Sequence, residues 1–185
     1  MIKFYQYFLW EFLKSSTRYA NTDIRKKKFF EFIQNHFLDI IPDDKLKNEI
    51  KKMMEDTESL ELFMNDNNLL EWLFRVKEDL TDDVALKPSA FGPIYWKILF
   101  SAAFCANTPE KRQNFRYLVL NLLTYLIPCK LCSEHWIENL RNGPNIDNFM
   151  DNNIELMRWL YEMKKIVDSP SHPPSFDEVV KRYNN

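Results

Sequence analysis

Two of the chain's three cysteines lie in the segment Ile127-Pro128-Cys129-Lys130-Leu131-Cys132-Ser133-Glu134-His135. A proline loses no hydrogen bond in the first turn of a helix, so we expect a helix that opens at Pro128. Cys129 and Cys132 would then share one helix face and lie close enough to form a disulfide. The helix N-terminus lowers the pKa of a thiol, most of all that of Cys129. The segment therefore has the chemistry of a redox pair, with Cys129 as the exposed sulfur.

Three other interpretations of this pair start from the same residues. Two buried cysteines on a helix can simply pack in a core. Cys129, Cys132 and His135 could instead bind zinc, and only Cys105 or His172 could then supply the fourth ligand. A thioredoxin-like site would need a βαβ unit, and no stretch of the sequence alternates like a strand. The packed and zinc interpretations stay open beside the redox one.

Composition excludes several classes of function. The chain has 185 residues, a net charge of −2 and only two glycines. Without a basic excess there is no electrostatic case for nucleic acid, and so few glycines argue against a phosphate-binding loop. No apolar run approaches the roughly 18 residues of a membrane span, and no signal peptide is evident. We therefore expect an intracellular protein without a membrane span.

Helical periodicity runs through the whole chain and predicts an all-α fold. Asp43 is the expected N-cap of one helix. The segment from Thr81 to Ala90, with Lys87-Pro88-Ser89, is the expected linker between the two halves. The predicted helices are 8–19, 26–41, 45–55, 69–80, 93–106, 109–126, 129–141, 154–167 and 176–183.

The second half of the sequence repeats the first. Residues 10–22 align without gaps on residues 96–108, a shift of 86 (96 minus 10), and six of the thirteen pairs are identical. The same shift matches Ile41-Pro42 with Ile127-Pro128, and one residue of slippage later Trp72-Leu73 matches Trp159-Leu160. We interpret this as a tandem duplication. We predict a degenerate helical repeat over 1–86 and a domain bearing the site over 87–185. At the position of the cysteine pair the first copy reads Asp43-Asp44-Lys45-Leu46, so it has no thiol.

The second half resembles the Erv/ALR family of FAD-dependent sulfhydryl oxidases, over roughly residues 88 to 183. The matching residues are Gly92-Pro-Ile-Tyr-Trp96, Pro128-Cys129-x-x-Cys132-x-x-His135, Trp159-Leu160 and Val167-Asp168. The resemblance is to the versions in large DNA viruses (poxviruses, asfarviruses, baculoviruses). A viral origin would place the chain in the host cytoplasm or the virion.

The resemblance implies a four-helix bundle plus a short helix that holds FAD. The family's histidine on its first helix is Phe100 here, its His-Asn pair falls on Lys164 and Lys165, and its final Asn is Asp168. An aromatic ring at Phe100 can still stack on a flavin or adenine ring, and Lys164 can still meet a phosphate. The residues expected to contact FAD are Gly92, Trp96, Phe100, His135, Lys164, Lys165, Val167 and Asp168, and no metal is expected.

The resemblance also implies thiol oxidation: Cys129 reacts with a substrate thiol, Cys132 passes two electrons to the flavin, and oxygen becomes hydrogen peroxide. The chain has no second cysteine pair, so we expect it to act directly on a protein dithiol such as a small redox relay protein. Because the family forms homodimers, we expect the first copy to pack on the second as an internal pseudo-dimer; a further homodimer is compatible with this. The competing classes are a helical interaction protein that has lost flavin and a zinc-stabilised helical module.

Overall fold

The computed structural model describes residues 2–55, 57, 59–65, 68–77, 88–168 and 174–184, and most of these residues lie in helices joined by short turns. The predicted all-α fold is confirmed. No strand occurs in these ranges, and none of their helices is both long and apolar enough to cross a membrane. The expected linker falls mostly on residues outside the described ranges.

The first half contains α1 (Ile2–Tyr19), α2 (Asp23–Asn35), the 3₁₀ turn η1 (Phe37–Ile40), α3 (Asp44–Glu55), α4 (Leu60–Asn65) and α5 (Leu69–Val76). The predicted helix 26–41 is two elements, because the chain leaves α2 at His36. Asp43 caps α3 as expected, since its Oδ1 accepts the Leu46 N–H at 2.8 Å.

The second half contains α6 (Pro88–Cys105), α7 (Pro109–Tyr117), a π-helical turn η2 (Leu118–Leu122), α8 (Leu123–Leu126), α9 (Lys130–Asn142), the 3₁₀ turn η3 (Ile146–Phe149), α10 (Asn153–Asp168) and α11 (Phe176–Asn184). Helix α6 begins at Pro88, so the predicted linker to Ala90 was too long. A proline fits the first turn of a helix without losing a hydrogen bond, which makes Pro88 a helix start and not a break.

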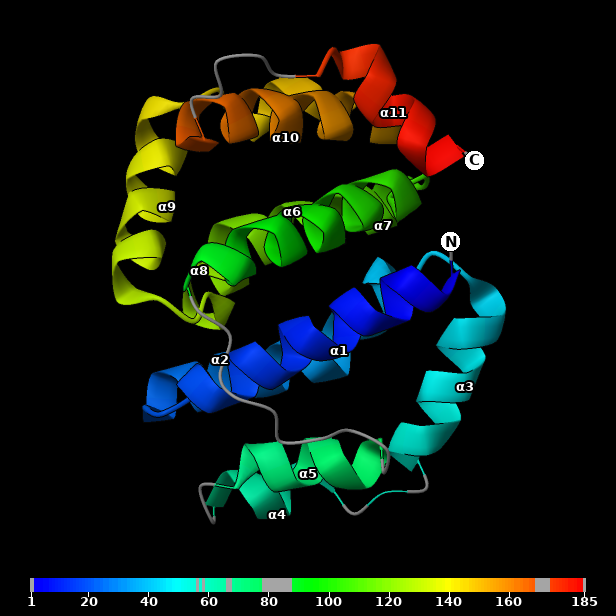
Figure 1. Cartoon of the computed structure of the whole chain (residues 1–185), viewed down its shortest axis with the longest axis vertical. Coiled ribbons are helices and arrows are strands. Elements are labelled where there is room, and N and C mark those ends of the chain that lie inside the picture. The colour runs from blue at the N-terminus through cyan, green and yellow to red at the C-terminus, as the bar shows by residue number, and fades with distance from the viewer. Residues whose placement is uncertain are drawn as a thin grey trace.

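Helix boundaries repeat with the same shift as the sequence. Adding 86 to the bounds of α1 gives 88–105, the bounds of α6, and adding it to η1 gives 123–126, the bounds of α8. Helix α3 becomes 130–141, against 130–142 for α9. In Figure 1, α3 and α5 lie about the α1–α2 pair as α9 and α10 lie about the α6–α7 pair, on opposite sides of the molecule. This repetition supports the duplication predicted from the sequence.

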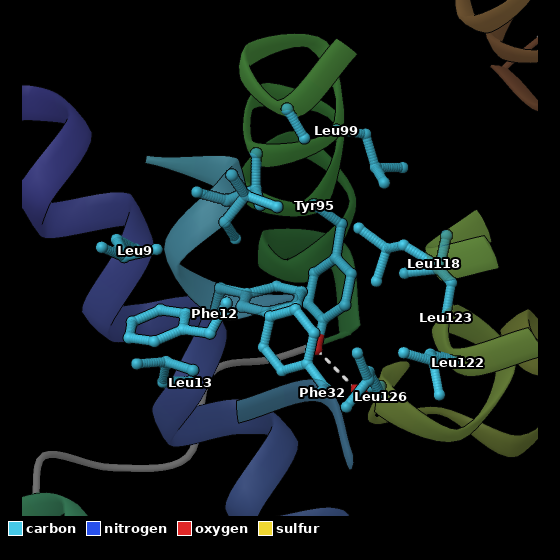
Figure 2. Packing of buried hydrophobic residues seen from close by; sticks show 14 of the residues in the cluster. Leu9, Phe12, Leu13, Phe32, Tyr95, Leu99, Leu118, Leu122, Leu123 and Leu126 are labelled. Atoms are coloured by element: carbon cyan, nitrogen blue, oxygen red, sulfur yellow. Dashed lines mark hydrogen bonds between the residues drawn. The ribbon is translucent and has the colours of Figure 1, made fainter. Parts of the chain in front are cut away.

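A single apolar core joins the two halves through α1 and α6. Figure 2 shows Leu9, Phe12 and Leu13 of α1 and Phe32 of α2 facing Tyr95 and Leu99 of α6 and leucines of η2 and α8. The Phe12 ring lies 4.7 Å from that of Tyr95, centroid to centroid, and 5.7 Å from that of Phe32. The hydrophobic effect therefore holds the halves together, since separating them would expose this surface to water.

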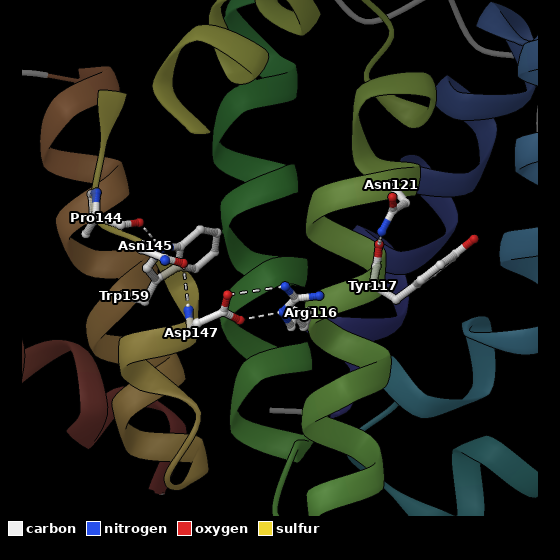
Figure 3. Close-up of polar contacts among 7 residues, drawn as sticks. All are labelled: Arg116, Tyr117, Asn121, Pro144, Asn145, Asp147 and Trp159. Atoms are coloured by element: carbon white, nitrogen blue, oxygen red, sulfur yellow. Dashed lines mark hydrogen bonds and ion pairs between the residues drawn. The ribbon is translucent and has the colours of Figure 1, made fainter. Parts of the chain in front are cut away.

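Polar contacts fix the outer elements of the second half (Figure 3). Arg116 Nε on α7 donates to Asp147 Oδ1 of η3 at 2.6 Å, and the Trp159 indole N–H on α10 donates to the Pro144 carbonyl at 2.8 Å. Trp159 is fully buried. These contacts tie η3 to α7 and tie α10 to the segment that follows α9. Helix α10 forms one wall of the site described next.

Candidate functional site

Cys129 and Cys132 form a disulfide at the start of α9, with their Cα atoms 5.2 Å apart. The predicted helix start at Pro128 is wrong: α9 begins at Lys130, and Cys129 is its N-cap with an extended backbone. The Cys129 Sγ accepts the backbone N–H of Cys132 at 3.2 Å. A sulfur in this position meets the positive end of the helix dipole, which favours its thiolate form once the disulfide is reduced.

Exposure differs between the two cysteines. Cys132 is exposed and Cys129 is half-buried, so the expectation that Cys129 carries the more exposed sulfur is wrong. As the N-cap, Cys129 turns its side chain onto the helix end instead of into solvent. Leu131, between the cysteines, is 60% exposed, an unusual place for a large apolar side chain.

A cavity of about 750 Å³ lies between α6 and α10 and is closed by α11 and the start of α1. Figure 1 shows these elements: α10 runs alongside α6, and α11 descends toward the end of α6. The volume is typical of ligand sites in proteins. Six predicted cofactor residues line this cavity: Gly92, Trp96, Phe100, Lys164, Lys165 and Asp168.

Two predicted cofactor residues do not line it. His135 lies on the exposed face of α9, and Val167 is 45% exposed. The spacing of these residues matched the family pattern, but their helix faces turn them outward. The two cysteines also lie outside the cavity lining as the described residues define it.

Aromatic side chains form much of the cavity wall. One face of the Phe100 ring is taken, because it stacks on Tyr183 of α11 at 5.9 Å between centroids. Burial raises the pKa of Tyr183 to about 12, so this ring brings no negative charge at ordinary pH. Trp96 has the Lys164 ammonium 5.3 Å from its ring centroid, a cation–π contact.

Positive charge predominates around the cavity. Lys97, Lys164, Lys165 and Arg182 line it, against two carboxylates, Asp43 and Asp168. Lys164 is ion-paired with Asp168 one turn further along α10, and Lys165 with Glu162. A cavity with apolar rings and an excess of cations suits a flat aromatic ligand that carries negative charge.

The first half contributes part of the wall, which sequence reasoning missed. Tyr5, Phe8, Pro42 and Asp43 all line the cavity. The Tyr5 hydroxyl donates to the Ile40 carbonyl at 2.6 Å, and the Lys97 ammonium of α6 lies 3.7 Å from the centroid of the Phe8 ring. Only the fold brings these residues to the second half, so no motif could have identified them.

Trp136 connects the cavity wall to the disulfide helix. It lies on α9 one turn after Cys132, and its ring is 6.2 Å from that of Trp96 and 6.2 Å from that of Trp159. Its indole N–H donates to the Val119 carbonyl at 3.1 Å. Sequence reasoning overlooked it, although its spacing of four from Cys132 places it on the same side of the helix. Helix α9, which bears the disulfide, therefore contacts the cavity-lining Trp96 through Trp136.

Cys105 is the remaining thiol, half-buried at the end of α6. Burial raises its pKa to about 11 from an ordinary value of 9.0, with Lys111 and Lys47 opposing the shift. Because the folded state holds this proton more tightly, the thiol's contribution to stability is full below pH 9 and is lost as the pH rises through 11.

We therefore expect iodoacetamide to label Cys105 of the oxidised, folded protein at pH 8 about a hundredfold more slowly than in urea. Peptide mass spectrometry of timed samples measures this directly. Labelling at the unfolded rate would show that the thiol is not packed as the structure has it.

No group of three or more His, Cys, Asp and Glu side chains within the described ranges is arranged to hold a metal ion. His172, one of the two possible fourth zinc ligands, lies outside those ranges. The other, Cys105, is at the end of α6.

Comparison of the chain with protein-family models, with curated proteins and with solved structures found no match.

Proposed function

We propose that the protein is a flavin-linked thiol oxidase of the Erv/ALR type. One observation carries the proposal: six residues matched to the family pattern line a single cavity, and Trp136 on the helix bearing Cys129 and Cys132 contacts Trp96 in its wall. Trp96 and Lys164 lie 68 positions apart in the sequence (164 minus 96), and the fold brings them into contact in this wall.

The cavity fits FAD in size and in chemistry. A volume of about 750 Å³ is within the range of cofactor sites. Trp96 and Tyr161 offer apolar faces to a ring system, and Lys164, Lys165 and Arg182 offer cations to a diphosphate. These residues would hold the cofactor, with Gly92 leaving room beside Trp96, since a Cβ there would meet nothing within 4 Å.

The chain's own part in the reaction is disulfide exchange. A substrate thiolate attacks the Cys129 sulfur, a mixed disulfide forms, the Cys129–Cys132 bond breaks, and Cys132 leaves as a thiolate. The substrate's second thiolate then attacks its own sulfur in the mixed disulfide, and Cys129 leaves. Cys129 is suited to this second role because the Cys132 N–H already points at its sulfur. The substrate departs as a disulfide, and the enzyme pair keeps two electrons.

FAD, when bound, supplies the acceptor for those two electrons and passes them to oxygen, which leaves with two protons as hydrogen peroxide. Trp136 and Trp96 position the helix of the redox pair against the cavity wall.

The first half takes no part in thiol chemistry in this proposal and acts as an internal pseudo-dimer partner. At the position equivalent to Phe100 it has Lys14, which is buried and ion-paired with Glu11 at 2.7 Å. Breaking a buried ion pair costs free energy, because it leaves an uncompensated charge in the interior. The Lys14–Glu11 pair therefore occupies the position in the first half where Phe100 lines a cavity in the second. Because Cys105 is packed and no second cysteine pair exists, the substrate is a protein dithiol that reaches α9 directly.

A visible spectrum of the purified protein tests the proposal. We expect an absorbance band at about 450 nm from bound oxidised flavin. Trp96→Phe should weaken flavin retention, whereas Trp10→Phe, at the equivalent buried position of the first half, should not. Equal retention in the two variants would contradict the assignment of the cavity.

A colourless protein would instead support the second candidate, a helical interaction protein that keeps the fold without the cofactor. The stacking of Phe100 on Tyr183 favours that candidate, because it occupies a face where a cofactor ring could lie. Colourless protein with one bound zinc would support a zinc-stabilised module.

A further inference from the structure

The backbone segment that leads into Cys129 is held by side chains at every carbonyl from residue 124 to 127. Ser133 Oγ donates to the Thr124 carbonyl at 2.7 Å, and the Tyr95 hydroxyl donates to that of Leu126 at 2.7 Å. The last carbonyls of a helix have no partner within the helix, so they need donors from elsewhere. Here α8 ends at Leu126 and its carbonyls point to the interface between the halves.

The remaining carbonyls of the segment are held by the first half. The Arg25 guanidinium on α2 donates from Nη1 to the Tyr125 carbonyl at 2.9 Å and to the Ile127 carbonyl at 3.1 Å. Ser16 Oγ on α1 adds a second bond to the Leu126 carbonyl at 3.1 Å. The first half, which has no cysteine, therefore hydrogen-bonds the backbone on both sides of Leu126. Ile127 lies two positions before Cys129.

The charge of Arg25 matters at this place. The C-terminal end of a helix carries partial negative charge, about half an elementary charge for a long helix. Leu126 ends α8 three residues before Cys129, the N-cap of α9. Unneutralised carbonyl dipoles there would disfavour a Cys129 thiolate. The positive charge of the Arg25 guanidinium, which is hydrogen-bonded to the Tyr125 and Ile127 carbonyls, offsets the negative potential of these dipoles. The nearest charges on α9 itself, Lys130 and Glu134, pair with each other at 3.8 Å on the exposed face and largely cancel.

We propose that Arg25 of the thiol-less half is a positioning residue for the redox pair: it holds residues 125–127 and so sets the reactivity of Cys129. The biological meaning of this inference rests on the proposed oxidase function, but its physical content does not need a flavin. It assigns to the degenerate copy a direct role at the disulfide, beyond that of a packing partner.

Thiol alkylation of the reduced protein tests the inference. We would compare wild type with Arg25→Gln, which removes the charge, and Arg25→Lys, which keeps it on a shorter side chain. Lys27→Ala, two residues away and exposed, is the control on the same helix. Iodoacetamide labelling of Cys129 is followed by peptide mass spectrometry at one pH near 7. Circular dichroism melts report whether each variant is folded.

We expect Cys129 labelling to slow about fivefold to tenfold in Arg25→Gln and about twofold in Arg25→Lys, with Lys27→Ala unchanged. The Cys129–Cys132 reduction potential in glutathione buffers should become more negative in the same order, because the reduced form loses stabilisation. Rates equal to wild type in both Arg25 variants would overturn the inference. Should Arg25→Gln fail to fold, Arg25→Lys alone decides: slower labelling supports it and an unchanged rate refutes it. Flavin content and oxygen consumption, measured in parallel, would show separately whether the oxidase proposal fails.

Discussion

Replacing Cys129 with serine is expected to lower dithiol oxidation about a thousandfold or more, to the rate of the uncatalysed reaction. The variant keeps the α9 N-cap, since a serine hydroxyl can accept the Cys132 N–H as the sulfur does. It loses the sulfur that carries the mixed disulfide. The structure should therefore remain intact while turnover disappears, and oxygen consumption with a reduced protein dithiol measures this.

The partner variant, Cys132→Ser, distinguishes the roles of the two sulfurs. The trap uses a substrate with a single cysteine, activated as its mixed disulfide with thionitrobenzoate. In Cys132→Ser the Cys129 thiolate attacks the substrate sulfur and thionitrobenzoate leaves. Neither a second substrate thiol nor Cys132 remains to resolve the adduct, so non-reducing gels should show it. Trapping in Cys129→Ser instead would assign the attacked sulfur to Cys132, the more exposed residue. Cys105→Ser serves as the control and should turn over normally. Normal turnover in Cys129→Ser would defeat the proposed mechanism.

The second large effect is expected from Phe12→Ala, which should lower the free energy of unfolding by about 3–5 kcal/mol. Phe12 is 2% exposed and packs on Phe32 of its own half and on Tyr95 of the other. Removing the ring leaves a void that close-packed neighbours cannot fill. Tyr7→Ala, at a position 56% exposed on the same helix, should change stability by no more than about 0.5 kcal/mol.

Urea unfolding of Phe12→Ala also tests whether the halves are one cooperative unit. Circular dichroism reports both halves, whereas iodoacetamide labelling of Cys105 reports the end of α6 alone. Because Phe12 packs across the interface, the unfolding midpoints reported by both probes should fall to the same lower urea concentration. Two separated transitions, with only the first half destabilised, would show that the predicted domains 1–86 and 87–185 unfold independently.

Sequence patterns predicted the helices well where a local chemical rule decides the structure. Thr108 accepts the Lys111 N–H and Pro109 follows it at the first helical position, as the predicted start at 109 required. The rule failed at Pro128, where the same residue type precedes the cap instead of following it. The fixed φ of proline suits a place inside the first turn, as at Pro109, and a place before the N-cap, as at Pro128. The path that the backbone takes after α8 selects between the two.

The sequence by itself determined the all-α fold, because helical periodicity is a local feature. It also predicted a redox role for the cysteine pair and an internal repeat, from cysteine spacing and paired tryptophans. The resemblance to the Erv/ALR pattern selected six residues that line one cavity, Gly92, Trp96, Phe100, Lys164, Lys165 and Asp168. Within each helix, the spacing fixes the face that they occupy. Tertiary structure alone decided that His135 and Val167 face outward, that Tyr5 and Asp43 close the cavity, and that Arg25 reaches the segment before Cys129. Such contacts depend on how α1 and α2 pack against α6 and α8. Packing is set by the summed fit of many side chains, and no spacing within one helix records it.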